Sequence, residues 1–178
     1  METSSEDKSG MWSRISIPSD FSYLKDVDIF VQRILEKVGA SDFISGYIGL
    51  CVSESVNNAI YHGNKMDQNK HVTIFAECKN DWLTVEVADE GAGFNCDDLP
   101  DPTRTENLRK EGGRGLFIIR NLAEQISFKK NGSVVELKFK LNSEHQLLYR
   151  GNFRASSFQG RASCMDQGSD RGGEEKDR

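Results

Sequence analysis

The sequence predicts an α+β fold: a two-layer α/β sandwich in which helices cover one face of a mostly antiparallel sheet. Two observations lead to this prediction. Apolar and polar residues alternate in several short segments, as in strands with one buried face, and short turns join these segments in pairs. Elsewhere, apolar residues recur every three or four positions, as in amphipathic helices. Strands joined by short turns are antiparallel, so the predicted sheet is mostly antiparallel. The helices are expected to pack on one face of this sheet.

The first half of this pattern contains one strand and two helices. Residues 11–17, MWSRISI, alternate and precede a proline, which predicts the first strand. Residues 24–38 carry apolar side chains at helical spacing, and a glycine follows them. A second helix is expected from about Ser41 to His62, with Gly63-Asn64 as its stop.

The second half contains two predicted hairpins separated by a loop and a helix. Residues 71–78 and 82–89 alternate on either side of the short turn KND. Residues 95–112 show no periodicity and predict a long loop, and residues 115–126 predict a third helix. The second hairpin covers residues 126–141, in which Asn131-Gly132 is the favoured sequence of a type I′ turn.

Composition limits the possible functions. The chain has 178 residues, a length typical of one domain, with 28 acidic and 23 basic residues and a net charge of −5. This charge does not predict binding to nucleic acid or to an anionic membrane, and it favours a protein or small-molecule partner. The four cysteines form no zinc motif, and no signal peptide or apolar run of about 18 residues occurs. We therefore expect a cytoplasmic protein with no direct nucleic-acid or membrane contact.

The two ends of the chain differ from the middle. Residues 1–10 and 143–178 are rich in small and charged residues, which bury too little apolar surface to offset the entropy lost on ordering. We expect a disordered N-terminal tail, a folded domain over residues 11–142, and a mostly disordered C-terminal tail. Phe153 and Phe158 leave open that the first part of that tail docks on the domain or on a partner.

Three polar residues share one face of the second predicted helix. Glu54, Asn58 and His62 are spaced by four residues and therefore form a single stripe. Such a stripe is often only a solvated face. Asn57 and Asn58 are poor helix formers in mid-helix, however, which favours a functional contact over local propensity.

Two glycine-rich segments are further candidates. The strand over residues 82–89 ends at Asp89 and continues as Gly91-Ala92-Gly93, which by itself predicts no more than a turn. Residues 112–115, Gly-Gly-Arg-Gly, open the third helix, whose first N–H groups and positive dipole end suit an anion such as phosphate. No P-loop or dinucleotide-binding glycine motif is present.

Three segments in order resemble the ATP-binding boxes of the superfamily shared by gyrase, Hsp90, histidine kinases and MutL, which adopts a Bergerat-type ATP-binding fold. They are ESVNNAIYHGN, DEGAGF and GGRGLFIIRNL, at residues 54–64, 89–94 and 112–122. In detail they resemble the small anti-sigma factor serine-protein kinases of bacteria. The resemblance covers roughly residues 12–141, and the three boxes fall on the helix, strand end and helix start predicted above.

The resemblance implies a role for each matched residue in the first two boxes. Asn58 matches the residue that coordinates Mg²⁺ through its side-chain oxygen, which agrees with the preference of this cation for oxygen ligands. Glu54 matches the presumed general base of phosphoryl transfer. Asp89 matches the carboxylate that accepts the adenine amino group, and Gly91 and Gly93 let the backbone approach the nucleotide.

The remaining matches concern the last box and two looser positions. Gly113 and Gly115 match glycines whose N–H groups face the phosphates of ATP, and Arg114 would add positive charge there. Ser133 stands where relatives often carry a threonine near adenine. His62 matches a position that is often histidine in this subfamily, although a histidine at a helix end more commonly caps carbonyl groups.

The resemblance implies an ATP-dependent serine/threonine-protein kinase. Such an enzyme uses Mg-ATP to phosphorylate an anti-anti-sigma antagonist protein and sequesters an RNA polymerase sigma factor, an arrangement called partner switching. It also implies a homodimer through the first strand and helix, in the bacterial cytoplasm. The alternative is a nucleotide-gated binding module without catalysis. Glu54 beside Asn58 favours the kinase, because a binding module needs no general base.

Overall fold

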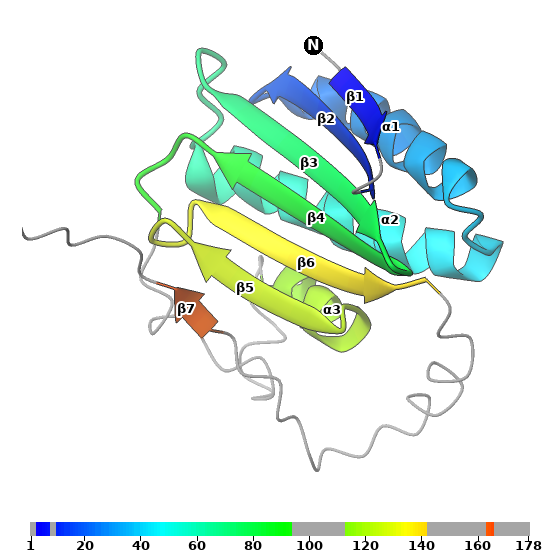
Figure 1. The fold of residues 1–178 in the computed structure, drawn as a ribbon. Coiled ribbons are helices and arrows are strands. Elements are labelled where there is room, and N and C mark those ends of the chain that lie inside the picture. The colour runs from blue at the N-terminus through cyan, green and yellow to red at the C-terminus, as the bar shows by residue number, and fades with distance from the viewer. Residues whose placement is uncertain (1–2, 8–9, 94–112, 142–162, 166–178) are drawn as a thin grey trace, which may run out of the picture.

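The computed structural model describes residues 3–7, 10–93, 113–141 and 163–165. These residues form one seven-stranded sheet in the order β1-β2-β3-β4-β6-β5-β7, and the helices α1, α2 and α3 lie on one face of it (Figure 1). Neighbouring strands are antiparallel, except that β5 and β7 are parallel. The predicted α+β class and two-layer architecture are therefore confirmed.

The elements have the following bounds. The strands are β1 (Thr3–Asp7), β2 (Gly10–Pro18), β3 (His71–Lys79), β4 (Trp82–Asp89), β5 (Gln125–Lys129), β6 (Val134–Lys140) and β7 (Ser163–Met165). The helices are α1 (Leu24–Lys37), α2 (Asp42–Asn58) and α3 (Gly113–Leu122), with a 3₁₀ turn η1 (Phe21–Tyr23) before α1 and a π-helical turn η2 (Ala59–Gly63) after α2. In the described part of the chain, no helix combines the length and apolar character that crossing a membrane requires.

The core lies between the sheet and the helices. Alternate residues of the central strands point into it, and one row of paired residues crosses the sheet: Ile15, Ile74, Val87 and Val135. The helices α1 and α2 cover this row with buried apolar side chains that include Phe30, Leu35, Ile48 and Val52. Burying a side chain of this size contributes about 1.5–3 kcal/mol, so this layer holds α2 firmly against the sheet.

The N-terminal residues differ from the sequence prediction. Residues 1–10 were expected to form a disordered tail, but Thr3–Asp7 form β1 and pair with β2 in antiparallel register. Without β1, the free edge of β2 would expose unpaired backbone N–H and C=O groups. Pairing with that edge needs only the backbone, so the polar composition of residues 3–7 does not prevent it.

The C-terminal half also needs two corrections. The third helix was expected to run to residue 126, but α3 ends at Leu122 and β5 begins at Gln125, which pairs with Lys138 of β6. The turn between β5 and β6 covers residues 130–133, and Lys130 has a positive φ of 50° in addition to Asn131 and Gly132. The run of residues with positive φ is therefore one residue longer than the predicted two-residue turn.

Other predicted boundaries hold. The hairpin of β3 and β4 turns at Asn80 and Asp81, which both have positive φ as a type I′ turn requires. Ser41 caps α2 by accepting a hydrogen bond at Oγ from the Ile44 N–H, at 3.4 Å. The predicted loop over residues 95–112 lies outside the described residues. Residues 143–178, the predicted C-terminal tail, also lie outside the described residues, apart from Ser163–Met165. These three residues form β7 beside β5 (Figure 1).

Candidate functional site

The predicted site residues gather in two groups at the end of β4 and along α2. We call Glu54, Asn58 and Gly115 the helix cluster, because α2 and α3 supply them. We call Gly63, Asp89 and Gly91 the strand-end cluster, because they lie where β4 ends against η2. Residues far apart in the sequence thus come together in each group, as the three-box pattern predicts.

In the helix cluster, two polar side chains of α2 face the first turn of α3. Glu54 and Asn58 are half-buried and lie one helical turn apart. A Cβ built at Gly115 would lie 2.5 Å from Glu54 Oε2 and 3.7 Å from Asn58 Nδ2. Only a residue without a side chain therefore fits at this position while the carboxylate keeps its place.

The chemistry of the helix cluster suits a phosphate group and its cation. The first N–H groups of α3 have no partners within the helix and can bind an anion. The carboxamide of Asn58 offers an oxygen atom, the ligand type that Mg²⁺ prefers, and the carboxylate of Glu54 lies one turn away. Mg²⁺ usually takes few ligands from protein and the rest from phosphate and water. Among the described residues, no group of three or more His, Cys, Asp or Glu side chains could hold a metal ion.

The strand-end cluster is centred on the Asp89 carboxylate. The Asp89 N–H donates to the Ser133 carbonyl at 2.9 Å, and Asp89 Oδ1 accepts a hydrogen bond from the Gly91 N–H at 2.8 Å. A Cβ at Gly63 would overlap the Asp89 carboxylate, and a Cβ at Gly91 would overlap the Gly63 carbonyl oxygen. Two backbone segments therefore enclose this carboxylate closely.

Burial sets the electrostatics of Asp89. Loss of solvent raises the pKa of its carboxyl above the usual value, although the Gly91 hydrogen bond and the nearby charge of Lys70 act in the opposite direction. The Gly91 N–H engages Oδ1, so Oδ2 can accept a hydrogen bond from the amino group of a ligand. A half-buried carboxylate with one fixed oxygen is suited to recognise such a group in one orientation.

Gly93 and Ser133 lie at the side of the strand-end cluster. Gly93 has a φ of 74°, and a Cβ there would overlap the carbonyl oxygen of Asn131 in the turn between β5 and β6. Ser133 Oγ donates to the Lys130 carbonyl at 2.9 Å, inside the same turn. Ser133 therefore meets Asp89 through its backbone carbonyl, while its hydroxyl stabilises the turn.

The remaining predicted residues are less fully placed. His62 is exposed in η2, where its ring packs edge-on against Tyr61 with 4.8 Å between the ring centroids. Partial loss of solvent around the ring, and to a smaller extent the charge of Lys65, lower the pKa of His62. Gly113 and Arg114 form the first turn of α3, but the Arg114 side chain lies outside the described part of the structure.

One important residue was missed in the sequence. Asn64, interpreted there as part of a helix stop and as the last residue of the first box, is completely buried. Its Oδ1 accepts from the Glu90 N–H at 2.8 Å and its Nδ2 donates to the His71 carbonyl at 2.9 Å, while Glu90 Oε2 accepts from the His71 N–H at 2.8 Å. The signals in the sequence were a helix-ending Gly-Asn and its place at the end of the first box, and neither indicates which strands the asparagine joins.

Comparison with known proteins points to one family. The histidine kinase-like ATPase domain matches residues 17–139. The serine-protein kinase RsbW of Bacillus subtilis (strain 168) is 27% identical over 137 residues, covering 73% of this chain and 86% of the relative. The serine-protein kinase RsbW of Staphylococcus aureus (strain MSSA476) is 23% identical over 136 residues, covering 72% and 86%. The matched region includes both clusters.

Proposed function

Because the chain belongs to the histidine kinase-like ATPase domain family, we propose that it is an ATP-dependent protein serine/threonine kinase. One observation carries the proposal: the Glu54 carboxylate and the Asn58 carboxamide lie together against Gly115 at the start of α3. A site for ATP binding alone would need oxygen ligands and a helix N-terminus. A carboxylate beside them adds the general base that phosphorylation of a hydroxyl uses.

Each cluster has a distinct task in this proposal. Asp89 accepts a hydrogen bond from the adenine amino group, and Gly91 and Gly93 let the backbone approach the base. Gly113 and Gly115 present N–H groups to the phosphates, and Arg114 adds positive charge. Asn58 holds Mg²⁺, which when bound neutralises charge on the phosphates. His62 and Ser133 border the base.

The chemical step follows from the position of Glu54. A serine or threonine hydroxyl oxygen attacks the γ-phosphorus of ATP, and the bond to the bridging oxygen breaks to release ADP. The hydroxyl proton passes to the Glu54 carboxylate. Glu54 and Asn58 lie on the same helix one turn apart, so the base and the cation ligand have a fixed spacing.

The substrate is proposed to be a protein. Both relatives described above carry the name serine-protein kinase. Together with the three-box resemblance to anti-sigma factor kinases, this favours an anti-anti-sigma antagonist as phosphate acceptor and an RNA polymerase sigma factor as the sequestered partner, in the bacterial cytoplasm. Phosphorylation of the antagonist would then decide which of the two partners is bound.

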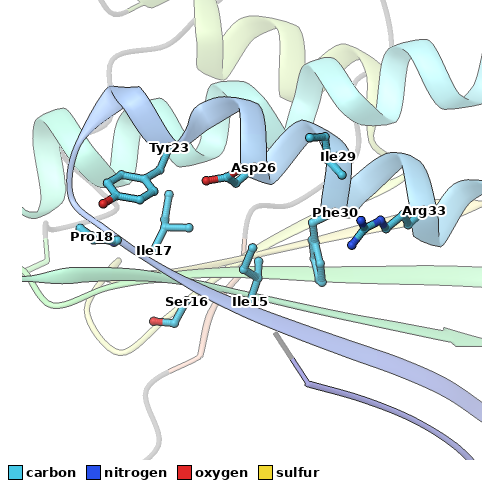
Figure 2. A pocket seen from close by; sticks show the side chains of 9 residues that line it. All are labelled: Ile15, Ser16, Ile17, Pro18, Tyr23, Asp26, Ile29, Phe30 and Arg33. Atoms are coloured by element: carbon cyan, nitrogen blue, oxygen red, sulfur yellow. The ribbon is translucent and has the colours of Figure 1, made fainter. Parts of the chain in front are cut away.

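We also propose a homodimer through β2 and α1. A pocket of about 420 Å³ lies between these elements and is lined by residues that include Ile15, Tyr23, Ile29 and Arg33 (Figure 2). Tyr23 and Ile29 expose 38% and 41% of their surface, so exposed apolar side chains border this pocket. Light scattering should give the dimer mass for the wild type and the monomer mass for Ile29→Asp. A monomeric wild type would contradict the dimer and leave the kinase proposal intact.

The test of the kinase is a phosphotransfer assay. The protein is incubated with Mg²⁺, γ-labelled ATP and candidate antagonist proteins from the same genome, beside Glu54→Gln and Asn58→Ala. We expect label on a serine or threonine of one antagonist, and a loss of about 10²–10⁴-fold in rate for Glu54→Gln with ATP binding retained. Tight ATP binding without label on any antagonist of a complete set would instead support a nucleotide-gated binding module.

A further inference from the structure

We propose that Gly63 and Asn64 are positioning residues for base recognition: Gly63 leaves the space that the Asp89 carboxylate occupies, and Asn64 fixes the end of β4 against η2. In the sequence these two residues end a helix and close the first box, and neither was assigned a role there. This inference rests on the proposed recognition of adenine by Asp89. It extends that proposal to two residues that need not touch the nucleotide.

Gly63 is required for space rather than for backbone conformation. Its φ is not among the positive values found at Gly10, Gly39, Gly93 and Gly132, so an L-residue could adopt its backbone. A Cβ at this position would nevertheless overlap all three terminal atoms of the Asp89 side chain. Because these atoms form the end of a flexible side chain, an added methyl group would push the carboxylate aside and leave the backbone in place.

Asn64 provides the second constraint. Its carboxamide accepts a hydrogen bond from the Glu90 N–H and donates one to the His71 carbonyl. The Glu90 carboxylate in turn accepts a hydrogen bond from the His71 N–H. The three residues thus form a closed ring of hydrogen bonds that joins the end of η2, the first residue of β3 and the residue after β4. Glu90 follows Asp89 directly, so the ring limits movement of the strand end that carries the carboxylate.

The π-helical turn places both residues where they are needed. The Asn64 N–H donates to the carbonyl of Ala59, five residues earlier, at 2.8 Å, and this π-type hydrogen bond widens the last turn of the helix. Such turns are rare and occur often at functional sites. In this protein the Gly63 carbonyl at the end of the widened turn lies against Gly91, where an added Cβ would overlap it.

The test measures base selectivity, which a purely structural role would not change. ATP and GTP share the triphosphate and differ in the base, so a loss of folded protein lowers binding of both equally. Calorimetric titration with Mg-ATP and Mg-GTP gives the ratio of the two dissociation constants for the wild type, Gly63→Ala and Asn64→Ala. Asp89→Asn serves as reference, because a carboxamide donates as well as accepts hydrogen bonds.

Gly46→Ala is the matched control. Gly46 lies in α2, and a Cβ there would meet nothing within 4 Å. We expect the preference for ATP over GTP to fall by about tenfold in Gly63→Ala, close to the value of Asp89→Asn, and to stay unchanged in Gly46→Ala. Asn64→Ala should also lower the preference.

The outcomes separate this inference from the proposed function. A wild type that binds neither nucleotide, or binds both equally, overturns the recognition of adenine and the inference with it. A wild type that prefers ATP while Gly63→Ala retains the same preference, or fails to fold, overturns the positioning role alone. A normal preference in Asn64→Ala overturns the part assigned to the hydrogen-bonded ring.

Discussion

The two clusters of the candidate site are held in different ways. In the strand-end cluster, the Gly91 N–H donates to the carboxylate of Asp89, and the Ser133 carbonyl and Asn64 Oδ1 accept hydrogen bonds from the N–H groups of Asp89 and Glu90. In the helix cluster, Glu54 and Asn58 meet Gly115 because α2 and α3 pack closely. The first arrangement depends on these hydrogen bonds as well as on the space left by Gly63, whereas the second depends on the space left by Gly115. They should therefore respond to different substitutions.

The largest effect is expected from removing the ring at the strand-end cluster. Asn64→Ala removes a buried carboxamide and leaves the Glu90 N–H and the His71 carbonyl, which are partly buried, without their side-chain partner. Each such group costs about 1–3 kcal/mol, so the free energy of unfolding should fall by about 2–4 kcal/mol. Urea unfolding measures this value. Asn69→Ala, at an exposed asparagine, is the control and should change it by less than about 0.5 kcal/mol.

The helix cluster should respond in activity rather than stability. Gly115→Ala places a methyl group against Glu54 Oε2, which can move because it ends a flexible side chain. We expect the phosphotransfer rate to fall about 10²-fold, since a displacement of about 1 Å at a reacting group can have that effect. Gly49→Ala, whose Cβ would meet nothing within 4 Å, should keep the rate. A normal rate in Gly115→Ala would show that the contact with Glu54 does not position the base.

A smaller effect is expected from the charge of Asp89. Burial raises the pKa of this carboxyl in the folded protein, so folding favours its neutral form. The stability that this gives is fully present below the unfolded pKa of 3.8 and is lost as the pH rises through the folded value. Asp89→Asn stays neutral and still accepts the Gly91 N–H.

Nucleotide-free Asp89→Asn should therefore be more stable than the wild type at pH 7, and this advantage should shrink as the pH falls toward 3.8. Urea unfolding at several pH values, without nucleotide, measures it. If the free energy of unfolding differed between Asp89→Asn and the wild type by the same amount at every pH, the folded protein would not disfavour the charged form of Asp89.

The smallest effect is expected outside both clusters. Gly46 is an exposed glycine in α2 with open space around its Cβ position. Gly46→Ala should raise the free energy of unfolding by about 0.5–1 kcal/mol, because alanine loses less conformational freedom in a helix. A thermal melt checks the result. A destabilised Gly46→Ala would show that a glycine in α2 has a role that the contacts do not reveal, and it would weaken its use as a control.

Much of the site was predictable because it depends on neighbours along the chain. Helical periodicity is enough to place Glu54 and Asn58 on one face of α2, and alternation is enough to end β4 at Asp89. The strand β1 was not predictable in this way. Its residues are polar, and the reason for their order is the open edge of β2 beside them.

The sequence by itself determined the α+β class, the antiparallel hairpins, the polar stripe of α2 and the glycines that open α3, because each rests on a pattern within a few residues. Only the tertiary structure decided that Gly115 faces Glu54, that Gly63 makes room for Asp89, and that Asn64 joins η2 to two strands. These contacts join residues on different elements. They depend on how the sheet and helices pack, which no local period encodes.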